Sequence, residues 1–445
     1  MINNDKFILP RLERLFLRIY SKIMIQSLIR WSQRYSHVKW VLGDQLMVSG
    51  INFLTGILLA RFLGVESYGQ FVLLYTVFLY GNTFQVALII TPMMSLAPQA
   101  SSDTERTNYF KGIITLQLLF SFLLSLVVVL LGKGAAKWFP SLISEDYLLP
   151  LAAGLLFFQL QDWLRRYYFV CQKSRAVFIN DFISYGGQIV ILFLFYKLGK
   201  LSIANVFWAI TVSSAVAFLL GALTENIRPA WSYAWQAFQR SWRFGRDLLF
   251  SGQIYWVGSQ GILIFAGSIL GAKAVGGIRA AQNIVGLLNI FFQAMENIIP
   301  IQAAQHYIQN QITGLMNYLK KIILLGGLLL AVPCLAIALL SKHLMGLAYG
   351  KAYLAFSDLI IWSLLIAFIA FFRIQGFYFF RTIGYTKEIL FNTIVSTILT
   401  FLFTGIFVYQ FQEIGIMIAL VLGEASGLIF VLIRGYKSFK NLNNS

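Results

Sequence analysis

Apolar runs of about 20 residues recur along the whole of this 445-residue chain, and they limit its fold more than any other feature. A helix of that length crosses the roughly 30 Å of hydrocarbon in a bilayer. In lipid every backbone N–H and C=O must be bonded within the protein, and these runs are too long for barrel strands. The mean hydropathy of +0.73 and the charged fraction of only 12% fit the same class. The sequence therefore predicts an all-α membrane protein.

Glycine, proline or charged residues separate the runs, and these breaks predict about 12 transmembrane helices. The longest interior connection, residues 224–246, is basic and rich in tryptophan, which suits the headgroup region. The predicted spans are 41–62, 71–96, 110–132, 148–170, 177–197, 203–223, 247–270, 278–301, 318–341, 355–380, 388–409 and 413–434. The expected domains are a basic interfacial arm at 1–40, an N-lobe at 41–223, an interfacial linker at 224–246, a C-lobe at 247–434 and a tail at 435–445.

An internal repeat relates the two lobes. The stretch LGVESYG from Leu63 returns as LGAKAVG from Leu270, an offset of 207 residues, and at the same offset Asn82 meets Asn289. Further on, the NYFK motif of the N-lobe matches NYLK in the C-lobe, in the same order. Ordered landmarks at nearly constant offset indicate a duplicated six-helix unit. Since six is even, both copies enter the membrane from one side, as in a parallel repeat.

Two glycines mark the corner that the repeat shares. We expect Gly64 and Gly69 to let the chain reverse between the first two spans, with a positive φ where glycine alone is comfortable. Gly271 and Gly276 would form the same corner in the C-lobe. The repeat therefore predicts two equivalent turns at one end of the bundle.

Positive charge sets the expected orientation. Most of the 35 Lys and Arg residues fall in the segments that share a side with the two termini. Because basic residues are retained on the cytoplasmic side, we expect both termini to be cytoplasmic in a multi-pass protein. The net charge of +18 lies in these short loops, so it predicts no nucleic-acid partner.

The eighth span carries a polar stripe at steps of three and four residues. It either faces a hydrated cavity that accepts a polar substrate or forms a hydrogen-bonded seam between helices. The second span carries Asn82 and Gln85 at the matching depth. The residues of the stripe are Arg279, Asn283, Asn289, Gln293 and Glu296.

The fourth and tenth spans hold further charges. Asp162, Arg165 and Arg166 stand at i, i+3 and i+4, so Asp162 can neutralise one arginine and leave the other for an anion. The arginines could instead reach toward the inner surface. Arg373 lies deep in the tenth span.

Three more acids have local interpretations. Asp44 and Asp247 stand at equivalent helix N-termini, where the helix dipole favours a carboxylate. Glu424, alone in the twelfth span, would either couple to an ion or make a local hydrogen bond.

Several function classes are excluded by what the sequence lacks. Two cysteines and three histidines lie in separate segments, so no metal cluster or disulfide framework is expected. The absence of a GxxxxGK[ST] motif excludes an ATP-driven pump within this chain. Short outer loops without convergent acids and histidines predict that the chain is not an enzyme and needs no cofactor.

The stretch DQLMVSGINFLTGILLARFLGVESYGQFVLLYTVF, from Asp44 to Phe78, resembles the first two spans of the Wzx-type polysaccharide and oligosaccharide flippases. Their superfamily also includes the multidrug exporters called MATE and the lipid II flippase. The resemblance implies two lobes in a V, in the bacterial cytoplasmic membrane. It implies alternating access that carries a polyprenyl-pyrophosphate-linked oligosaccharide outward, for O-antigen, capsule or exopolysaccharide synthesis. Polymerases and glycosyltransferases of that pathway would be partners.

The resemblance also assigns expected roles to the polar residues. Arginines would hold the pyrophosphate, amides would bond sugar hydroxyls, and Glu296 would orient an arginine or couple to a proton. A drug or cation antiporter of the same fold, or a membrane polysaccharide polymerase or ligase, are the alternatives. The expected pyrophosphate ligands are Arg279, Arg165, Arg166 and Arg373, and the expected sugar ligands are Asn283, Asn289, Gln293, Asn82 and Gln85.

Overall fold

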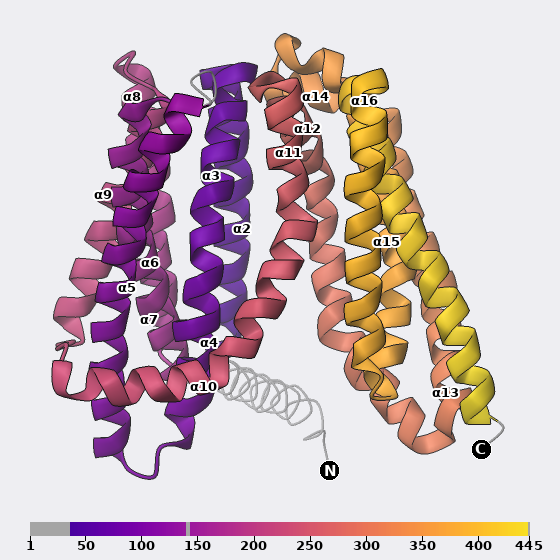
Figure 1. The fold of residues 1–445 in the computed structure, drawn as a ribbon, viewed down its shortest axis with the longest axis horizontal. Helices are drawn as coiled ribbons and strands as arrows, with labels where there is room; N and C mark the ends of the chain where they lie inside the picture. The colour runs from indigo at the N-terminus through magenta and orange to yellow at the C-terminus, as the bar shows by residue number, and fades with distance from the viewer. Residues whose placement is uncertain (1–35, 139–142, 444–445) are drawn as a thin grey trace, which may run out of the picture.

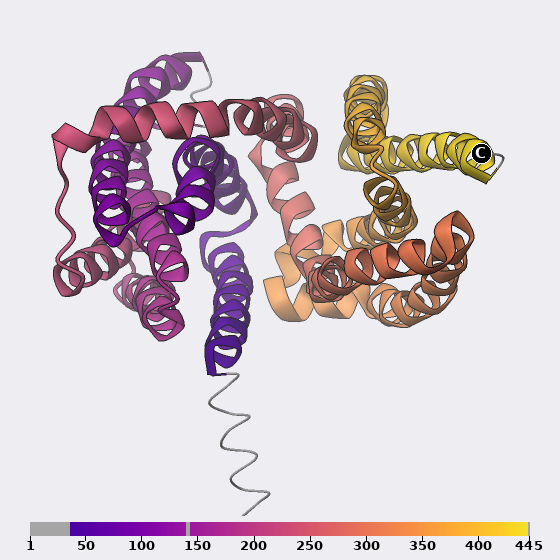
Figure 2. The ribbon, with the colours of Figure 1, turned by 90° about the horizontal axis from the view of Figure 1, so that it is seen from below.

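The computed structural model describes residues 36–138 and 143–443, and every regular element in these stretches is helical. Figure 1 shows two bundles of helices side by side, and Figure 2 shows the same pair from below. The predicted arm at 1–40 lies almost entirely outside the described residues. Large apolar side chains such as Phe122, Leu131 and Leu329 are exposed, as expected where lipid rather than water covers a helix. The chain is an all-α membrane protein, as predicted.

The first half of the chain supplies the N-lobe, in which short turns join antiparallel helices. Its elements are α2 (Ser36–Leu63), α3 (Val65–Gln85), η1 (Val86–Ile90), α4 (Thr91–Leu96), η2 (Ala97–Gln99), α5 (Asp103–Trp138), η3 (Glu145–Tyr147), α6 (Leu148–Val170), α7 (Ser174–Asp181), η4 (Phe182–Gly186), α8 (Gly187–Lys197) and α9 (Ile203–Thr224).

The second half repeats this pattern with longer elements. They are α10 (Trp231–Trp256), η5 (Val257–Gly261), α11 (Ile262–Leu270), α12 (Ala272–Val285), η6 (Gly286–Leu288), α13 (Asn289–Leu339), α14 (Ser341–Tyr349), η7 (Lys351–Phe356), α15 (Asp358–Thr382) and α16 (Thr386–Asn443).

Elements and membrane spans do not correspond one to one. Nine helices among the described residues are long and apolar enough to cross a membrane. The last of them covers 55 residues, or about 80 Å at about 1.5 Å per residue, far more than one bilayer needs. It reverses at Gln412, whose φ of 50° and ψ of −126° are not helical. In α13 the chain reverses likewise at Asn310 and Gln311. Both breaks lie between predicted spans.

The internal duplication is visible in matched local geometry. Gly64 has φ 80° and ψ 170°, and its counterpart Gly271 has φ 81° and ψ 175°. Asn180 donates from Nδ2 to the carbonyl of Ala217 at 2.8 Å, and its counterpart Asn392 donates to the carbonyl of Gly427 at 2.7 Å. The same backbone conformation and the same interhelical bond therefore recur in both lobes.

The lobes touch at the end of the molecule that holds these two glycine corners, here called the turn end. There α3 crosses α12 at backbone distance: a Cβ on Gly69 would lie 1.7 Å from the carbonyl oxygen of Ala272. In the mirrored contact, a Cβ on Gly276 would lie 2.3 Å from the carbonyl oxygen of Val65. Gly64 turns the chain with positive φ, as expected. The turn role expected of Gly69 is wrong, because this residue is helical and serves as the contact point between lobes.

Away from this contact the lobes separate. Figure 1 shows their ribbons diverging toward the end where the described chain begins and finishes, here called the terminal end. One apolar core cluster joins residues of both lobes, among them Phe71 and Val275. A second cluster lies inside the N-lobe around Trp163, with Ala237 of α10 packed into it. The shared core therefore includes the turn-end contact, and the N-lobe keeps a core of its own.

Helix α10 crosses the predicted boundary at residue 246 without a break. Its first half lies across the terminal end of the N-lobe (Figures 1 and 2). Its second half also packs on that lobe. The ring centroids of Trp256 and Tyr80 are 4.4 Å apart, and Gln253 Nε2 donates to Thr83 Oγ1 at 3.1 Å. The chain reaches the C-lobe only through η5 and α11. The linker and the first part of the seventh span thus form one continuous helix, which bends where it leaves the terminal end (Figure 1).

Replacing Gly69 by alanine tests the backbone contact between the lobes. The added methyl group must push α3 and α12 apart, so we expect a lower thermal midpoint, equivalent to about 1–3 kcal/mol. Gly50→Ala is the matched control, since that helical glycine has nothing within 4 Å of an added Cβ. Scanning fluorimetry in detergent measures the thermal midpoints of both variants. Equal midpoints would show that α3 and α12 do not approach at backbone distance.

Candidate functional site

The polar stripe of the eighth span runs down a single helical column, from α12 through η6 into α13. At about 1.5 Å of rise per residue, Arg279 lies about 12 Å below Gly271 and Glu296 about 38 Å below it. The stripe therefore extends from near the turn end to the terminal end. Its members meet different surroundings and cannot form one compact site.

Asn283 belongs to the junction between the lobes. Its Nδ2 donates to the hydroxyl of Tyr68 on α3 at 3.0 Å. The same nitrogen lies 3.0 Å from the position that a Cβ on Gly56 of α2 would take. This part of the stripe is a seam between helices, one of the two expected alternatives.

Arg279 lies at the same junction and differs from the other predicted arginines. It is half-buried and close enough to interact electrostatically with Tyr68 and Tyr75 of α3 and with Tyr349 of α14. Within the described part of the chain it has no ion-pair partner. A half-buried guanidinium surrounded by phenols and without a carboxylate is a position that an anion would stabilise.

The lower half of the stripe is open. Asn289, Gln293 and Glu296 are exposed. Glu296 accepts from the Tyr378 hydroxyl at 2.9 Å and forms an ion pair with Arg381, both on α15. Glu296 therefore orients an arginine of the C-lobe, while the two amides remain available to a ligand.

Arg165 is held inside the N-lobe by two carboxylates. Its guanidinium lies 2.9 Å from Asp44 of α2 and 2.5 Å from Asp181 of α7, and the three side chains are 11%, 1% and 0% exposed. Gln161 adds a donor to Asp181 at 2.8 Å. Buried charges persist only when paired, so this cluster ties three segments together. It contains one more carboxylate than guanidinium groups.

This cluster corrects two expectations. Arg166 pairs with Asp162 at 3.4 Å, as the spacing predicted, but Arg165 is not left for an anion. Asp44 was expected to serve a helix N-terminus, and it is instead the ion-pair partner of Arg165. The side chain of Asp247 lies outside the described residues. Neither arginine of the fourth span is unpaired in this conformation.

Arg373 is likewise paired, within the C-lobe. Its Nε lies 3.2 Å from Glu424 of α16, and its Nη1 donates to Ser396 at 3.3 Å. Gly427 makes room for the guanidinium, because a Cβ there would lie 2.7 Å from Nη1. Glu424 is therefore the partner of an arginine and not a lone acid.

The two lobes differ in charge at equivalent positions. The repeat aligns Arg373 with Gln161 and Glu424 with Ser214. Where the C-lobe pairs Arg373 with Glu424, the N-lobe has the amide of Gln161, which donates to Asn180 and Asp181, and the hydroxyl of Ser214, which lies 3.3 Å from that of Ser184. The duplicated frame thus carries a charged pair in one lobe and neutral groups in the other.

The two amides of the second span point to different uses. Gln85 is fully buried inside the N-lobe and donates to Gln117 Oε1 at 3.1 Å and to the carbonyl of Gln159 at 2.7 Å. Its expected contact with sugar is not available in this conformation, because its amide links helices of one lobe. Asn82 is half-buried, and its Oδ1 has no hydrogen-bond partner among the described residues.

Among the described residues, one of the predicted arginines has no carboxylate partner, and the amides of Asn289 and Gln293 are exposed. Arg165, Arg166 and Arg373 are satisfied by carboxylates, whereas Arg279 is not. Sequence reasoning missed Tyr68, Tyr75 and Asp181, because their partners lie on distant segments. A ligand with an anionic group and many hydroxyls would match Arg279, Asn289 and Gln293. No group of three or more His, Cys, Asp or Glu side chains that could hold a metal occurs in the described residues.

Comparison with known families gives a match over most of the chain. A family described as "Polysaccharide biosynthesis protein" matches residues 58–358. The "Putative O-antigen transporter" of Escherichia coli (strain K12) is 24% identical over 88% of this chain and 95% of its own length. The "Uncharacterized membrane protein EpsK" of Bacillus subtilis (strain 168) is 24% identical over 68% of this chain, and the match covers 62% of that protein.

Solved structures with the same fold differ in what they transport. An inward-facing MATE multidrug transporter of the MOP superfamily has a TM-score of 0.73, with 16% identity over 92% of this chain and 99% of that one. The lipid II flippase MurJ, inward closed, has a TM-score of 0.67, with 14% identity over 91% of this chain and 90% of that one. The fold is therefore MATE-like, and it does not by itself choose between a drug and a lipid.

Replacing Arg165 by glutamine tests the N-lobe cluster. Removal of the guanidinium leaves two buried carboxylates without their partner, so we expect a loss of about 3–5 kcal/mol. Arg166→Gln removes the same charge one position away, from a half-buried i, i+4 pair with a longer separation of 3.4 Å and a single carboxylate, and should cost only about 1 kcal/mol. Thermal unfolding of both purified variants gives the comparison. A variant at Arg165 as stable as the one at Arg166 would contradict the cluster.

Proposed function

The chain belongs to the polysaccharide biosynthesis protein family, and from this membership we propose that it flips a polyprenyl-pyrophosphate-linked oligosaccharide across the bacterial cytoplasmic membrane. The glycan moves from the inner to the outer leaflet, as polysaccharide synthesis requires. The N-lobe, with α10 packed on it, and the C-lobe rock about the space between them, and η5 and α11 join them. The chain acts as a transporter and leaves the bond chemistry to glycosyltransferases and polymerases.

The observation that carries this proposal is the unpaired charge of Arg279. A pyrophosphate presents several anionic oxygens, and a guanidinium binds such groups through parallel N–H donors. Because the other three predicted arginines already have carboxylates, Arg279 is the anchor for the pyrophosphate. The exposed amides of Asn289 and Gln293 lie below it, where sugar hydroxyls would follow.

Because the turn end is closed, this conformation represents one state of the proposed transport cycle. With both termini cytoplasmic, as the distribution of basic residues supports, the glycine contact lies on the outer side and the separated ends face the cytoplasm. Substrate then enters from the inner leaflet while the Gly69–Gly276 contact seals the outside. Opening that contact releases the glycan outward.

Depletion of the protein in polysaccharide-producing cells tests the proposed function. We expect lipid-linked oligosaccharide to accumulate in the inner leaflet, where it stays protected from reagents added outside. If glycan crossed normally and only the polymer became shorter, the chain would act as a polymerase. If glycan crossing were unaffected and drug efflux fell, the chain would be an antiporter of the same fold.

Replacing Arg279 by glutamine tests the anchor. Flipping of the lipid-linked glycan in proteoliposomes should fall at least tenfold, because pyrophosphate loses its charged partner, while membrane insertion and thermal midpoint stay unchanged. Arg434→Gln is the control, since it removes an arginine that pairs with Glu388, both on α16. Full flipping by the Arg279 variant would remove this residue from the transport path.

A further inference from the structure

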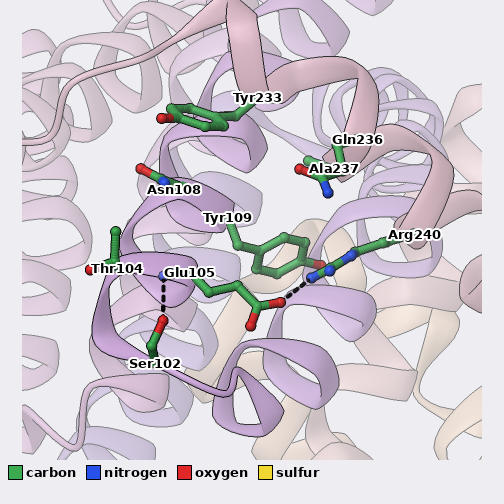
Figure 3. A pocket seen from close by; sticks show the side chains of 9 residues that line it. All are labelled: Ser102, Thr104, Glu105, Asn108, Tyr109, Tyr233, Gln236, Ala237 and Arg240. Atoms are coloured by element: carbon green, nitrogen blue, oxygen red, sulfur yellow. Dashed lines mark hydrogen bonds and ion pairs between the residues drawn. The ribbon is translucent and has the colours of Figure 1, made fainter.

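A polar pocket lies on the N-lobe, between the first turns of α5 and the underside of α10, lined by residues of these two helices (Figure 3). Its volume of about 450 Å³ is within the range of small-ligand sites, about 300–1,000 Å³. None of the residues assigned above to the space between the lobes lines it. The pocket is therefore separate from the transport path.

Helix α10 shows why the pocket faces water. Small residues, Ala234, Ala237, Ser241 and Gly245, form its buried face, and Gly112 of α5 lets it approach, since a Cβ there would lie 2.5 Å from the carbonyl of Tyr233. A second face exposes the aromatic stripe Trp231, Trp235, Phe238 and Trp242, which marks the headgroup level of a bilayer. At about 100° per residue, Gln236 and Arg240 lie on the side opposite the stripe. The pocket thus opens away from the hydrocarbon.

The pocket wall contains a buried hydroxyl with spare hydrogen-bonding capacity. Tyr109 is only 6% exposed, and its hydroxyl lies beside that of Ser241, close enough for the two to share a hydrogen bond. Both side chains are buried, and neither hydroxyl has another hydrogen-bond partner among the described residues. Buried polar groups are nearly always bonded to protein, water or ligand, so the Tyr109 and Ser241 hydroxyls together leave capacity at this wall for a water molecule or a ligand.

The charges of the pocket restrict the ligand. Arg240 donates to Glu105 at 2.9 Å (Figure 3). The Glu105 carboxylate also accepts from the backbone N–H of Ser101. An anion would have to compete with Glu105 for Arg240. Asn108 and Gln236 each offer a donor and an acceptor, and hydroxyls of Ser102 and Tyr233 complete the lining. Groups that both donate and accept, around a neutralised ion pair, suit a neutral ligand with many hydroxyls.

We propose that this pocket binds sugar residues on the terminal side of the membrane, outside the path between the lobes. Saccharide hydroxyls donate and accept in equal measure, so they can satisfy Tyr109 and the two amides together. The glycan of a lipid-linked oligosaccharide is the source present at this level of the bilayer, and in that respect the inference rests on the proposed function. The pocket would hold the glycan before or beside its passage between the lobes.

Photo-crosslinking in polysaccharide-producing cells tests the site. p-Benzoylphenylalanine at Thr104, an exposed residue of the pocket wall, should capture adducts that contain sugar residues by mass spectrometry. The same group at Arg243, exposed on α10 and outside the pocket lining, should give at least fivefold fewer. Tyr109→Phe and the double variant Asn108→Ala/Gln236→Ala should lower the yield at Thr104 severalfold. Equal sugar yields at the two positions, or adducts with protein or phospholipid alone, would overturn the proposal.

A flipping assay on the double variant separates this inference from the proposed function. The variant should flip glycan at high substrate concentration as wild type does, with a raised half-saturating concentration. If the wild-type chain captured sugar at Thr104 but flipped no glycan, the sugar-binding pocket would be supported and the proposed flippase function would be contradicted. If the half-saturating substrate concentration were unchanged and no sugar were captured, the sugar-binding pocket would be contradicted while the proposed flippase function would be unaffected.

Discussion

The close contact of α3 with α12 is the interaction on which the rest of the structure depends. Gly69 and Gly276 bring two helix backbones together at one end, and any side chain at either position would separate them. The two glycines occupy equivalent positions in the duplicated unit. Each copy of the repeat therefore supplies one of the two glycines of the contact. The lobes are joined there and separate at the other end, which is the geometry that alternating access requires.

Charge neutralisation is the second constraint. A charge within the membrane must find a partner, water or a ligand. Arg165 and Arg373 have carboxylates on other helices of their own lobes, so they hold those helices together, whereas Arg166 is neutralised within α6. Arg279 stands at the junction near three tyrosines, and in the proposed function it is the group that would meet the phosphate of the substrate. Glu296 and Arg381 complete a pair near the terminal end.

Periodic and repeated features could be predicted from the sequence, and contacts between distant segments could not. The apolar runs predicted the helical membrane class. The glycine repeat predicted the duplication and the positive φ of Gly64. The spacing of Gly69 looked like part of a turn, because a packing role appears only when α12 is seen beside it. Asp44 and Arg165 are 121 positions apart in the sequence, and Glu424 and Arg373 lie on different helices. No local sequence pattern therefore predicts either ion pair.

Crosslinking across the turn-end contact tests the central claim most directly. Glu66 and Lys273 are exposed, equivalent residues on α3 and α12 beside the two glycines. Cysteines at both positions, in a chain lacking its own two cysteines, can be joined by a short reducible crosslinker. Flipping of lipid-linked oligosaccharide in proteoliposomes should stop when the link forms and return when it is reduced. Undiminished flipping by the fully crosslinked protein would contradict the account.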